Sequence, residues 1–369
     1  MELDQILSHY SEFANDCLEY KRNQDFNKRL DNGDIEGYEL LFKKPDGEEQ
    51  AISLISATLF VNDLPTYRQA FQLDLDQQRK FALNSEEFTE NERAYNRLLT
   101  MVKNKATIIP FVGAGFSVAA GCPSWSDYIL NQAVRAGMNE QEVRDRLKRG
   151  DHEILMDEVI DLLTLNIFQR DFRDQFEGRT ISPSLSPSLE LVGLFDECYI
   201  TTNFDRVLDQ SHSTNHPFDE KVIGGEANER FLKAIYRSEK YLLKLHGNID
   251  NQENRVLTLA EYNRGYGTGE IDYSLPIPRT LKKVFGSYSV LFVGCSLIAD
   301  RYLEILKSCH EENPEFIPDH FAILVAPSDE DELMARDQFL ASHGVTPIWF
   351  RDGDWEKPAE ILKLLKVER

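Results

Sequence analysis

The chain has 369 residues, of which 41% are hydrophobic and 28% charged, a composition typical of a soluble protein with room for two domains. Its 63 acidic residues outnumber its 41 basic residues, and the net charge of −22 disfavours a broad nucleic-acid-binding face, because neutralising phosphates takes clustered cations. No apolar run is long enough to span a bilayer and the N-terminus is acidic and polar, so we expect a cytoplasmic protein.

Residues 1–104 carry helical patterns but no catalytic signature. LDQILSHYSEFANDCLEYKR spaces its apolar residues as a helix does, and YELLFKK followed by PDGEE predicts a strand and a turn. AISLISATLFVNDL and PTYRQAFQLDL are ambiguous. FTENERAYNRLLTMVKN predicts an amphipathic helix with Thr89 as its cap and Glu92 three residues later. We therefore expect a mainly helical region that serves packing or oligomerisation.

From residue 105 to residue 369, strands alternate with helices. TIIPFVG predicts the first strand, and further strands are predicted at ECYITTNF, YLLKLHG, SVLFVGCS, HFAILVAP and TPIWF. Between the first two, a helical insertion is expected at about residues 140–187, ending in the Pro/Ser loop ISPSLSPS. Apolar strands alternating with helices predict an α/β domain with a parallel sheet covered on both faces.

Four of these strands end in glycine or polar residues. They are Gly113, Ala114, Gly115 and Ser117 after the first strand, Thr202, Asn203 and Asp205 after the second, His246 before Gly247 after the third, and Gly294 and Ser296 after the fourth. Ligands of parallel α/β sheets bind at the carboxyl ends of the strands, so the four endings together predict one binding site.

Two familiar nucleotide-binding motifs do not fit the glycine turn. The dinucleotide fingerprint G-x-G-x-x-G needs a third glycine where Val118 stands, and the P-loop sequence is absent. Each strand ending also has an ordinary structural explanation. Gly113 and Gly115 can serve a turn alone, Asn203 and Asp205 can form an Asx turn or helix cap, and a histidine before glycine can be a core residue.

The joint order G-A-G-x-S, T-T-N-F-D, K-L-H-G and G-C-S, over about residues 105–355, resembles the sirtuin family. That resemblance implies a Rossmann-like sheet that binds NAD. The chain departs from sirtuin deacylases, however, because it lacks their four-cysteine zinc module, and Ser126 stands in place of the arginine of their G-I-P-D-F-R stretch. The G-x-P-x-W version of that stretch, the long helical insertion and LTLAEY resemble instead the SIR2-like NAD-hydrolysing effectors of bacterial antiphage defence.

The resemblance implies that NAD⁺ is the substrate and that its nicotinamide–ribose bond is cleaved. By the family match, phosphates are held by Gly113, Ala114, Gly115 and Ser117, ribose and water by Asn203, the nicotinamide amide by Asp205 and the adenosine half by Gly294 and Ser296, while Thr202 takes the place of the family's glutamine. His246 receives the role of general base, because it is the only group of the set with an ordinary pKa near neutrality.

Two other functions stay open at this point. A protein deacylase uses the same NAD pocket but needs an acyl-lysine channel beside a zinc module, and a non-catalytic sensor would bind NAD or ADP-ribose without needing a base. We expect no metal, because the five cysteines form no C-x-x-C pair and are typical of reduced core thiols. The resemblance further implies a homo-oligomer and a HerA-like hexameric ATPase as a possible partner.

Overall fold

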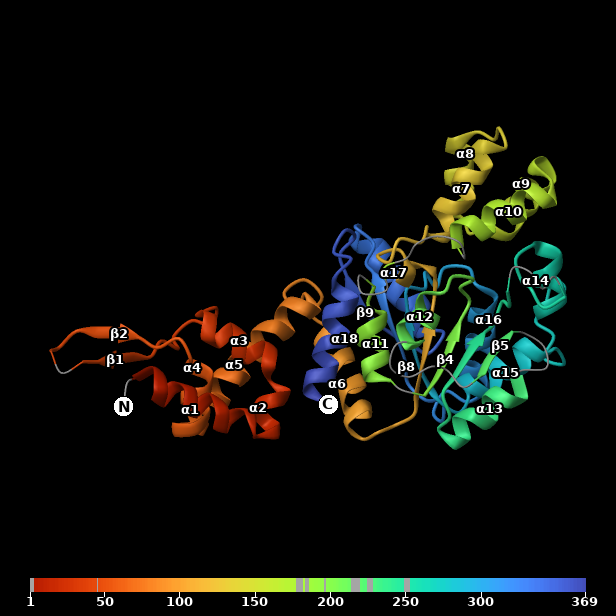
Figure 1. The fold of residues 1–369 in the computed structure, drawn as a ribbon. Coiled ribbons are helices and arrows are strands. Elements are labelled where there is room, and N and C mark those ends of the chain that lie inside the picture. The colour runs from red at the N-terminus through yellow and green to blue at the C-terminus, as the bar shows by residue number, and fades with distance from the viewer. Residues whose placement is uncertain are drawn as a thin grey trace. The chain divides into compact units, whose positions relative to one another are not determined.

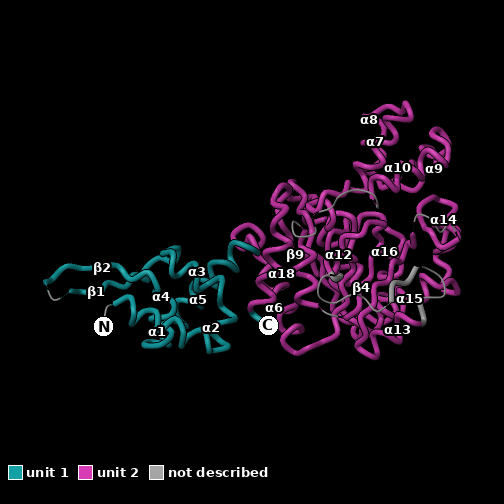
Figure 2. Tube along the Cα trace, in the orientation of Figure 1, with its two compact units in different colours: residues 1–82, 368 teal, residues 83–367, 369 magenta. Residues whose placement is uncertain are grey.

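The computed structural model describes residues 3–44, 46–176, 182, 186–195, 197–213, 220–223, 228–248 and 253–369 (Figure 1). The chain forms two compact units, the first ending at Ala82 and including Glu368, the second covering Leu83–Val367 with Arg369 (Figure 2). We expected the boundary near residue 104. It lies earlier because the helix that precedes the first sheet strand packs in the second unit.

The first unit is helical with one hairpin. Its elements are α1 (Leu3–Asn15), α2 (Leu18–Arg22), α3 (Gln24–Asn32), β1 (Leu41–Lys43), β2 (Glu49–Ala51), α4 (Ile55–Asn62) and α5 (Leu64–Leu83). The two segments whose pattern was ambiguous are therefore helices. Aromatic rings hold the core, where the Tyr67 ring meets Phe26 and Phe60 edge-on at 5.3 and 5.0 Å. The Tyr67 hydroxyl donates to Asn27 Oδ1 at 2.6 Å, which satisfies a buried polar pair.

The second unit is an α/β domain. Its strands are β3 (Ile108–Val112), β4 (Cys198–Thr201), β5 (Glu220–Ile223), β6 (Tyr241–Lys244), β7 (Ser289–Val293), β8 (His320–Val325) and β9 (Val345–Phe350). Its helices are α6 (Asn91–Lys103), the 3₁₀ helix η1 (Ala114–Ser117), α7 (Trp125–Arg135), α8 (Glu140–Lys148), α9 (His152–Leu163), α10 (Leu165–Phe176), α11 (Ser188–Leu194), α12 (Val207–Ser213), α13 (Asn228–Arg237), α14 (Leu259–Tyr266), α15 (Pro276–Phe285), α16 (Arg301–Glu312), α17 (Glu330–Ala341) and α18 (Lys357–Glu368).

The strands form one parallel sheet in the order β5-β6-β4-β3-β7-β8-β9, which confirms the predicted fold class. Without β5, the strand order is that of a Rossmann sheet, 3-2-1-4-5-6. In this order the first three strands extend the sheet to one side and the last three to the other, so the switch point lies between β3 and β7. The edge strand β5 was not predicted. In such sheets the reversal point between the first and fourth strands opens the crevice that receives ligands.

A buried core joins the sheet to the helices that follow it. Phe111 on β3 contacts Phe292 on β7 and Tyr302 on α16, with ring centroids 5.1 and 4.9 Å apart. Four of the five cysteines are buried, and all five are free thiols. Among the described helices, none combines the length and hydropathy needed to cross a bilayer.

The insertion between β3 and β4 has a core of its own, built from α7 to α10. Phe172 lies at its centre and packs on Phe176 at 4.5 Å and on Tyr128 at 5.3 Å. Thr164, with a φ of +69°, separates α9 from α10 within the helical stretch that the sequence predicted. Half of the Pro/Ser loop that we expected to follow falls outside the described residues, and its last residue, Ser188, begins α11.

The start of α6 differs from the prediction, because Thr89 does not cap the helix. The helix begins at Asn91, a buried residue whose amide bonds other parts of the unit. Its Nδ2 donates to the carbonyl oxygens of Leu83 and Trp349 at 2.6 and 2.8 Å, and its Oδ1 accepts from the Trp349 N–H at 2.8 Å. The side chain thus satisfies both backbone groups of one residue on the edge strand β9.

We expect Asn91→Ala to lower the free energy of unfolding by about 1–3 kcal/mol, because the buried N–H of Trp349 would lose its acceptor. Asn96→Ala is the matched control, since Asn96 is exposed on the same helix, and its effect should stay within about 0.5 kcal/mol. Denaturant unfolding of both variants measures the difference. Equal losses would show that the Asn91 bonds contribute nothing.

Candidate functional site

Four strands of the sheet end in register. Val112 on β3 pairs with Val293 on β7 and with Thr201 on β4, and Thr201 pairs with Lys244 on β6. Each of these residues is the last of its strand. They therefore form one row across the sheet, and the four predicted motifs begin directly beyond it on the same edge.

Asn203 and His246 lie at equivalent positions on neighbouring strands. Each stands two residues beyond the paired ends Thr201 and Lys244, and the Leu245 N–H continues the ladder by donating to the Thr201 carbonyl at 2.8 Å. Adjacent strands are about 4.8 Å apart, so this register brings the two backbones side by side at the sheet edge.

The glycine turn after β3 packs directly on the end of β7. The Gly113 N–H donates to the Val293 carbonyl at 3.0 Å, and the Gly115 N–H donates to the Gly294 carbonyl at 2.9 Å. A Cβ on Gly113 would lie 2.5 Å from the Gly294 oxygen. Both amides are engaged within the chain, so in this conformation neither is open to a phosphate; Ala114 between them is half-buried.

Gly294 also needs to be glycine for conformational reasons. Its φ is +71°, and a Cβ at this position would lie 2.2 Å from the backbone nitrogen of Phe116. The next residue, Cys295, is buried and directs its thiol toward the Phe111 carbonyl at 3.6 Å. Burial raises the pKa of the Cys295 thiol, as expected of a packing residue.

Asn203 connects the β4 end to the glycine turn. Its Nδ2 donates to the Gly113 carbonyl at 3.0 Å and to Ser117 Oγ at 3.3 Å, and its backbone N–H donates to Thr201 Oγ1 at 3.1 Å. The side chain is buried, yet Oδ1 has no hydrogen-bond partner among the described residues. Since buried polar atoms are normally bonded, this oxygen is an acceptor available to a donor on a ligand.

Asp205 lies in the same network, and burial raises the pKa of its carboxyl. Its Oδ1 accepts from the Val207 N–H at 2.9 Å, and the Ser117 hydroxyl bonds the carboxylate, so Ser117 links Asn203 and Asp205. Both bonds favour the charged form and partly offset the desolvation.

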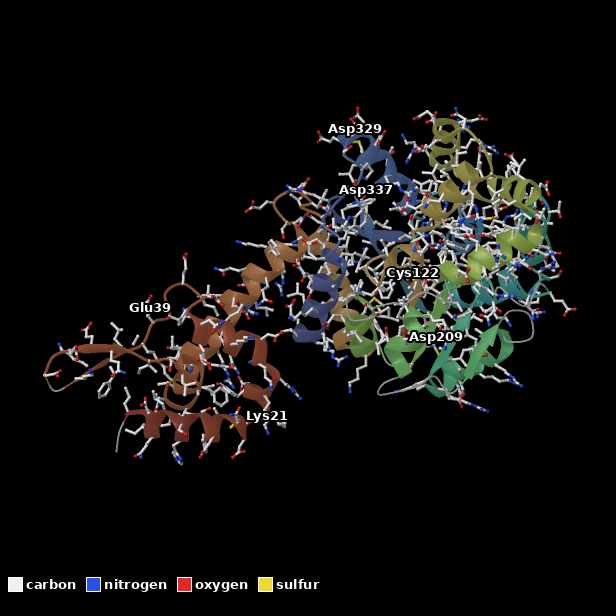
Figure 3. All side chains as sticks on the ribbon, turned by 45° about the horizontal axis from the view of Figure 1, so that its top comes forward. Lys21, Glu39, Cys122, Asp209, Asp329 and Asp337 are labelled. Atoms are coloured by element: carbon white, nitrogen blue, oxygen red, sulfur yellow. The ribbon has the colours of Figure 1, made fainter. Side chains whose placement is uncertain are left out.

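A buried cation that the sequence analysis left without a role supports this loop. Lys244 Nζ donates to the Asp205 carbonyl at 2.9 Å and lies 3.1 Å from Asp209 Oδ2 on α12, the residue marked in Figure 3. The lysine therefore ties the end of β6 to the loop after β4. Thr202 in that loop is half-buried, and its N–H reaches the Val112 carbonyl at 3.4 Å.

His246 is enclosed by two tyrosines of α14. Its Nε2 lies 3.0 Å from the Tyr266 hydroxyl, and its ring meets Tyr262 edge-on at 5.3 Å. Burial lowers the pKa of His246 to about 3, so the imidazole is neutral throughout the physiological range. We expected it to titrate near neutrality, and the structure corrects that expectation, because the sequence does not report how deeply the ring is buried.

The chain around His246 is fixed by its next neighbours. Gly247 has a φ of +74°, and the Val256 N–H returns to the His246 carbonyl at 3.0 Å. Beyond this contact, Thr258 and Glu261 form a capping box that starts α14, and Arg255 pairs with the buried Glu261 at 2.6 Å. The T-x-x-E pattern within LTLAEY carries the signal for this cap.

Ser296 stands outside the network of contacts that joins the other motif residues. It is exposed, and its carbonyl accepts from Arg336 on α17 at 2.7 Å. By contrast, Phe204, to which we gave no role, lies in the core of the helical insertion, where it meets Phe172 edge-on at 5.2 Å and Trp125 at 6.5 Å. The insertion is therefore packed against the residue between Asn203 and Asp205.

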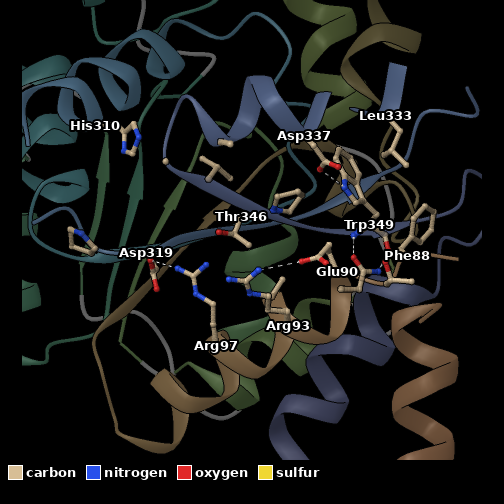
Figure 4. Close-up of a pocket in the computed structure, with 18 of the residues that line it drawn as sticks. Phe88, Glu90, Arg93, Arg97, His310, Asp319, Leu333, Asp337, Thr346 and Trp349 are labelled. Atoms are coloured by element: carbon tan, nitrogen blue, oxygen red, sulfur yellow. Dashed lines mark hydrogen bonds and ion pairs between the residues drawn. The ribbon is translucent and has the colours of Figure 1, made fainter. Parts of the chain in front are cut away.

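A cavity of about 650 Å³ lies away from these strand ends (Figure 4). It runs along the edge strand β9 from Val345 to Trp349 and contains none of the motif residues, whereas ligands of such sheets bind beyond the carboxyl ends of the strands. Its charges are largely paired within the wall, Arg97 with Asp319 and Arg93 with Glu90. We therefore assign the candidate site to the strand ends.

Within the described part of the chain, no group of three or more His, Cys, Asp or Glu side chains is arranged to hold a metal ion. Residues 197–348 match a family model described as a SIR2-like domain, so the chain carries a SIR2-like segment that includes three of the four strand endings. The glycine turn and the helical insertion precede this match. No curated protein matches the chain.

We expect Gly294→Ala to destabilise the protein far more than Gly353→Ala. Both glycines have positive φ, +71° and +95°, but a Cβ on Gly353 meets nothing within 4 Å, so that control should cost only the backbone term of about 1–2 kcal/mol. In Gly294→Ala the new methyl group would also push the glycine turn off β7. Denaturant unfolding compares the two, and equal losses would mean that the close approach is not required.

Proposed function

We propose that the protein is an NAD⁺ hydrolase that cleaves the nicotinamide–ribose bond and releases nicotinamide and ADP-ribose. One observation supports this most directly. In a SIR2-like segment, an amide with an open buried oxygen, Asn203, and a neutral imidazole, His246, stand at equivalent positions on adjacent strand ends. A ligand that met one group at this edge would also be near the other.

The chemistry needs few groups. The bond between the ribose anomeric carbon and the nicotinamide nitrogen breaks, its electron pair stays on nicotinamide, and water supplies the oxygen of the new C–O bond and gives up one proton. Asn203 Oδ1 would accept from a ribose hydroxyl or from the attacking water, which fixes their orientation. Burial lowers the pKa of His246, so its imidazole is neutral and one ring nitrogen has a lone pair that can receive the proton, although the same burial makes it a weaker base than an exposed histidine.

The glycine turn, Asp205 and the loop after β7 would hold the rest of the substrate. Asn203 and Ser117 tie the turn to the Asp205 loop, and the Gly115 N–H ties the turn to Gly294, so the three segments form one connected wall. Asp205 would then face the nicotinamide amide, and Ser296 the adenosine half, as the sirtuin resemblance implies. A phosphate at Gly113 or Gly115 would require their N–H groups to leave the β7 carbonyls.

We further propose that the protein is a cytoplasmic effector of antiphage defence, that it works as a homo-oligomer and that a HerA-like ATPase is its partner. These proposals follow from the resemblance of the sequence. The first unit, which has its own aromatic core and no catalytic motif, is the part of the chain that we assign to assembly. A soluble NADase needs such control, because unrestrained NAD⁺ hydrolysis would harm its own cell.

We expect Asn203→Ala and His246→Ala each to lower nicotinamide release from NAD⁺ by about 10²–10⁴-fold, the usual value of a positioned acid–base group. Asn96→Ala and His9→Ala change exposed residues of the same types and should keep the parent rate. The assay follows nicotinamide and ADP-ribose with the purified chain, alone and with the product of a neighbouring ATPase gene. Parent rates in both site variants would exclude this site.

The same assay separates the other two functions. A deacylase would release nicotinamide only when an acylated peptide is added, whereas hydrolysis needs no peptide. A sensor would bind NAD⁺ in calorimetry without consuming it, either with or without the ATPase. Either result would overturn the proposed hydrolase.

A further inference from the structure

Asp300 occupies a helix cap position but does not cap the helix. It precedes α16 with φ −80° and ψ 139°, the usual geometry of a capping residue, yet its side chain makes no hydrogen bond to the helix N-terminus. Asp329, labelled in Figure 3, shows the ordinary behaviour at the start of α17, where its carboxylate accepts from the Glu332 N–H at 3.0 Å. The Asp300 carboxyl group is directed elsewhere.

The carboxyl group of Asp300 is buried inside the protein, and one of its oxygens, Oδ2, has no hydrogen-bond partner among the described residues. The Tyr302 hydroxyl bonds the Asp300 carboxyl group, and the other buried carboxylates around the candidate site likewise have a donor or a cation beside them. Asp205 accepts from Val207 and Ser117, Asp209 pairs with Lys244, and Glu261 pairs with Arg255.

Asp300 belongs to the same cluster as His246. Burial raises the pKa of four groups, and the charge of Asp300 adds to each rise; they are Cys295 in the loop after β7, Tyr302 on α16, and Tyr262 and Tyr266 on α14. The hydroxyl of Tyr266 is the group that lies 3.0 Å from His246 Nε2. Arg301, the residue after Asp300, lies over the Tyr262 ring with its Cζ 5.4 Å from the ring centroid, and the same ring meets His246 at 5.3 Å. Tyr262 therefore contacts both His246 and the neighbour of Asp300.

The charges around Asp300 decide its protonation. Burial raises the pKa of Asp300 to about 6, the Tyr302 hydroxyl and Arg336 on α17 oppose this rise, and Glu153 on α9 adds to it. Arg301 on α16 is paired with Glu153 at 2.6 Å and limits that last effect. The carboxyl group therefore carries its charge at neutral pH and gains a proton as the pH falls toward 5.

We propose that Asp300 is the carboxylate of the hydrolysis, which accepts a hydrogen bond from the 2′-hydroxyl of the nicotinamide ribose and stabilises the positive charge on the ribosyl carbon. This inference rests on the proposed NAD⁺ hydrolysis. Cleavage of a glycosidic bond builds up an oxocarbenium-like centre, which a nearby carboxylate stabilises, and bonds to the 2-hydroxyl strengthen as the charge develops.

The step is balanced without a further reactant. The C–N bond breaks with its electron pair passing to nicotinamide, a water oxygen bonds the ribosyl carbon, and the water proton goes to His246 and from there to solvent. Asp300 stays ionised and is not consumed. Because Oδ2 has no hydrogen-bond partner among the described residues, a bond to a ribose hydroxyl would displace no existing hydrogen bond, and because Oδ2 is buried, the ribose would reach it only if the surrounding side chains moved.

Asp300→Asn tests the proposal, because asparagine keeps the shape and the capping ability of the side chain but removes its charge. We expect nicotinamide release to fall by about 10²–10³-fold, as for loss of an electrostatic group at a transition state. Asp329→Asn, a cap position in the same unit, should keep the parent rate. A parent rate in Asp300→Asn would overturn the proposal.

A second substrate distinguishes contact with the ribose from a structural role. The second substrate is an NAD⁺ whose nicotinamide ribose lacks the 2′-hydroxyl. On it, the ratio of the parent rate to the Asp300→Asn rate should be at least about tenfold smaller than on NAD⁺, because neither enzyme can bond the missing hydroxyl. An equal penalty on both substrates would overturn the proposal. If the parent releases no nicotinamide from NAD⁺ under any condition, the proposed function itself fails.

The pH dependence of stability provides a readout that needs no activity. A carboxyl whose pKa is raised in the folded state holds a proton that the unfolded chain has lost, so the parent loses stability as the pH rises from about 4 to about 6. Asp300→Asn lacks this loss. Its unfolding temperature should exceed that of the parent at about pH 7.5 and equal it at about pH 4. A lower unfolding temperature at both pH values would show that the charge serves packing, and would overturn the proposal.

Discussion

The in-register end of four parallel strands is the constraint on which the rest of the site depends. Val293, Val112, Thr201 and Lys244 form one row, so the loops that follow them must leave the sheet at the same height and compete for the same space. The Rossmann strand order places the reversal of the sheet within this row, between β7 and β3. Shifting any of these strands by one residue would turn its side chains to the other face and take its loop out of the cluster.

Close packing at the strand ends is enough to explain why Gly113 and Gly294 are glycines, without a bound ligand. The backbone of the turn after β3 donates to the end of β7, and neither Gly113 nor Gly294 has room for a Cβ. Glycines there are required by the fold, and a phosphate-binding role would be added to that requirement. Asn203, by contrast, keeps a buried oxygen open, and folding alone gives no reason for an unsatisfied acceptor. The evidence for a ligand therefore comes from the polar side chains more than from the glycine motif.

The sheet could be predicted because its strands are apolar runs between helices, and a candidate site could be proposed because strand ends of a parallel sheet share one edge. The details that escaped prediction depend on tertiary contacts. Thr89 has the spacing of a cap, but Asn91 starts the helix because its amide bonds β9. The low pKa of His246 follows from the tyrosines of α14, which are distant in sequence. The sequence around Phe204 and around Asp300 contains no motif that predicts which residues their side chains contact. The expected division near residue 104 ignored the contacts of α6 with the sheet. The strand β5 was missed because its sequence, EKVI, begins with two charged residues and forms no apolar run.

The placement of Phe204 has a mechanical consequence. Its ring belongs to the core of the inserted helices, while the residues on either side of it belong to the polar wall at the sheet edge. A rigid aromatic side chain in a close-packed core cannot slide independently of its surroundings. Any force that tilts the inserted helices would thus be transmitted through one ring to the peptide carrying Asn203, so that the insertion acts as a lever on the amide.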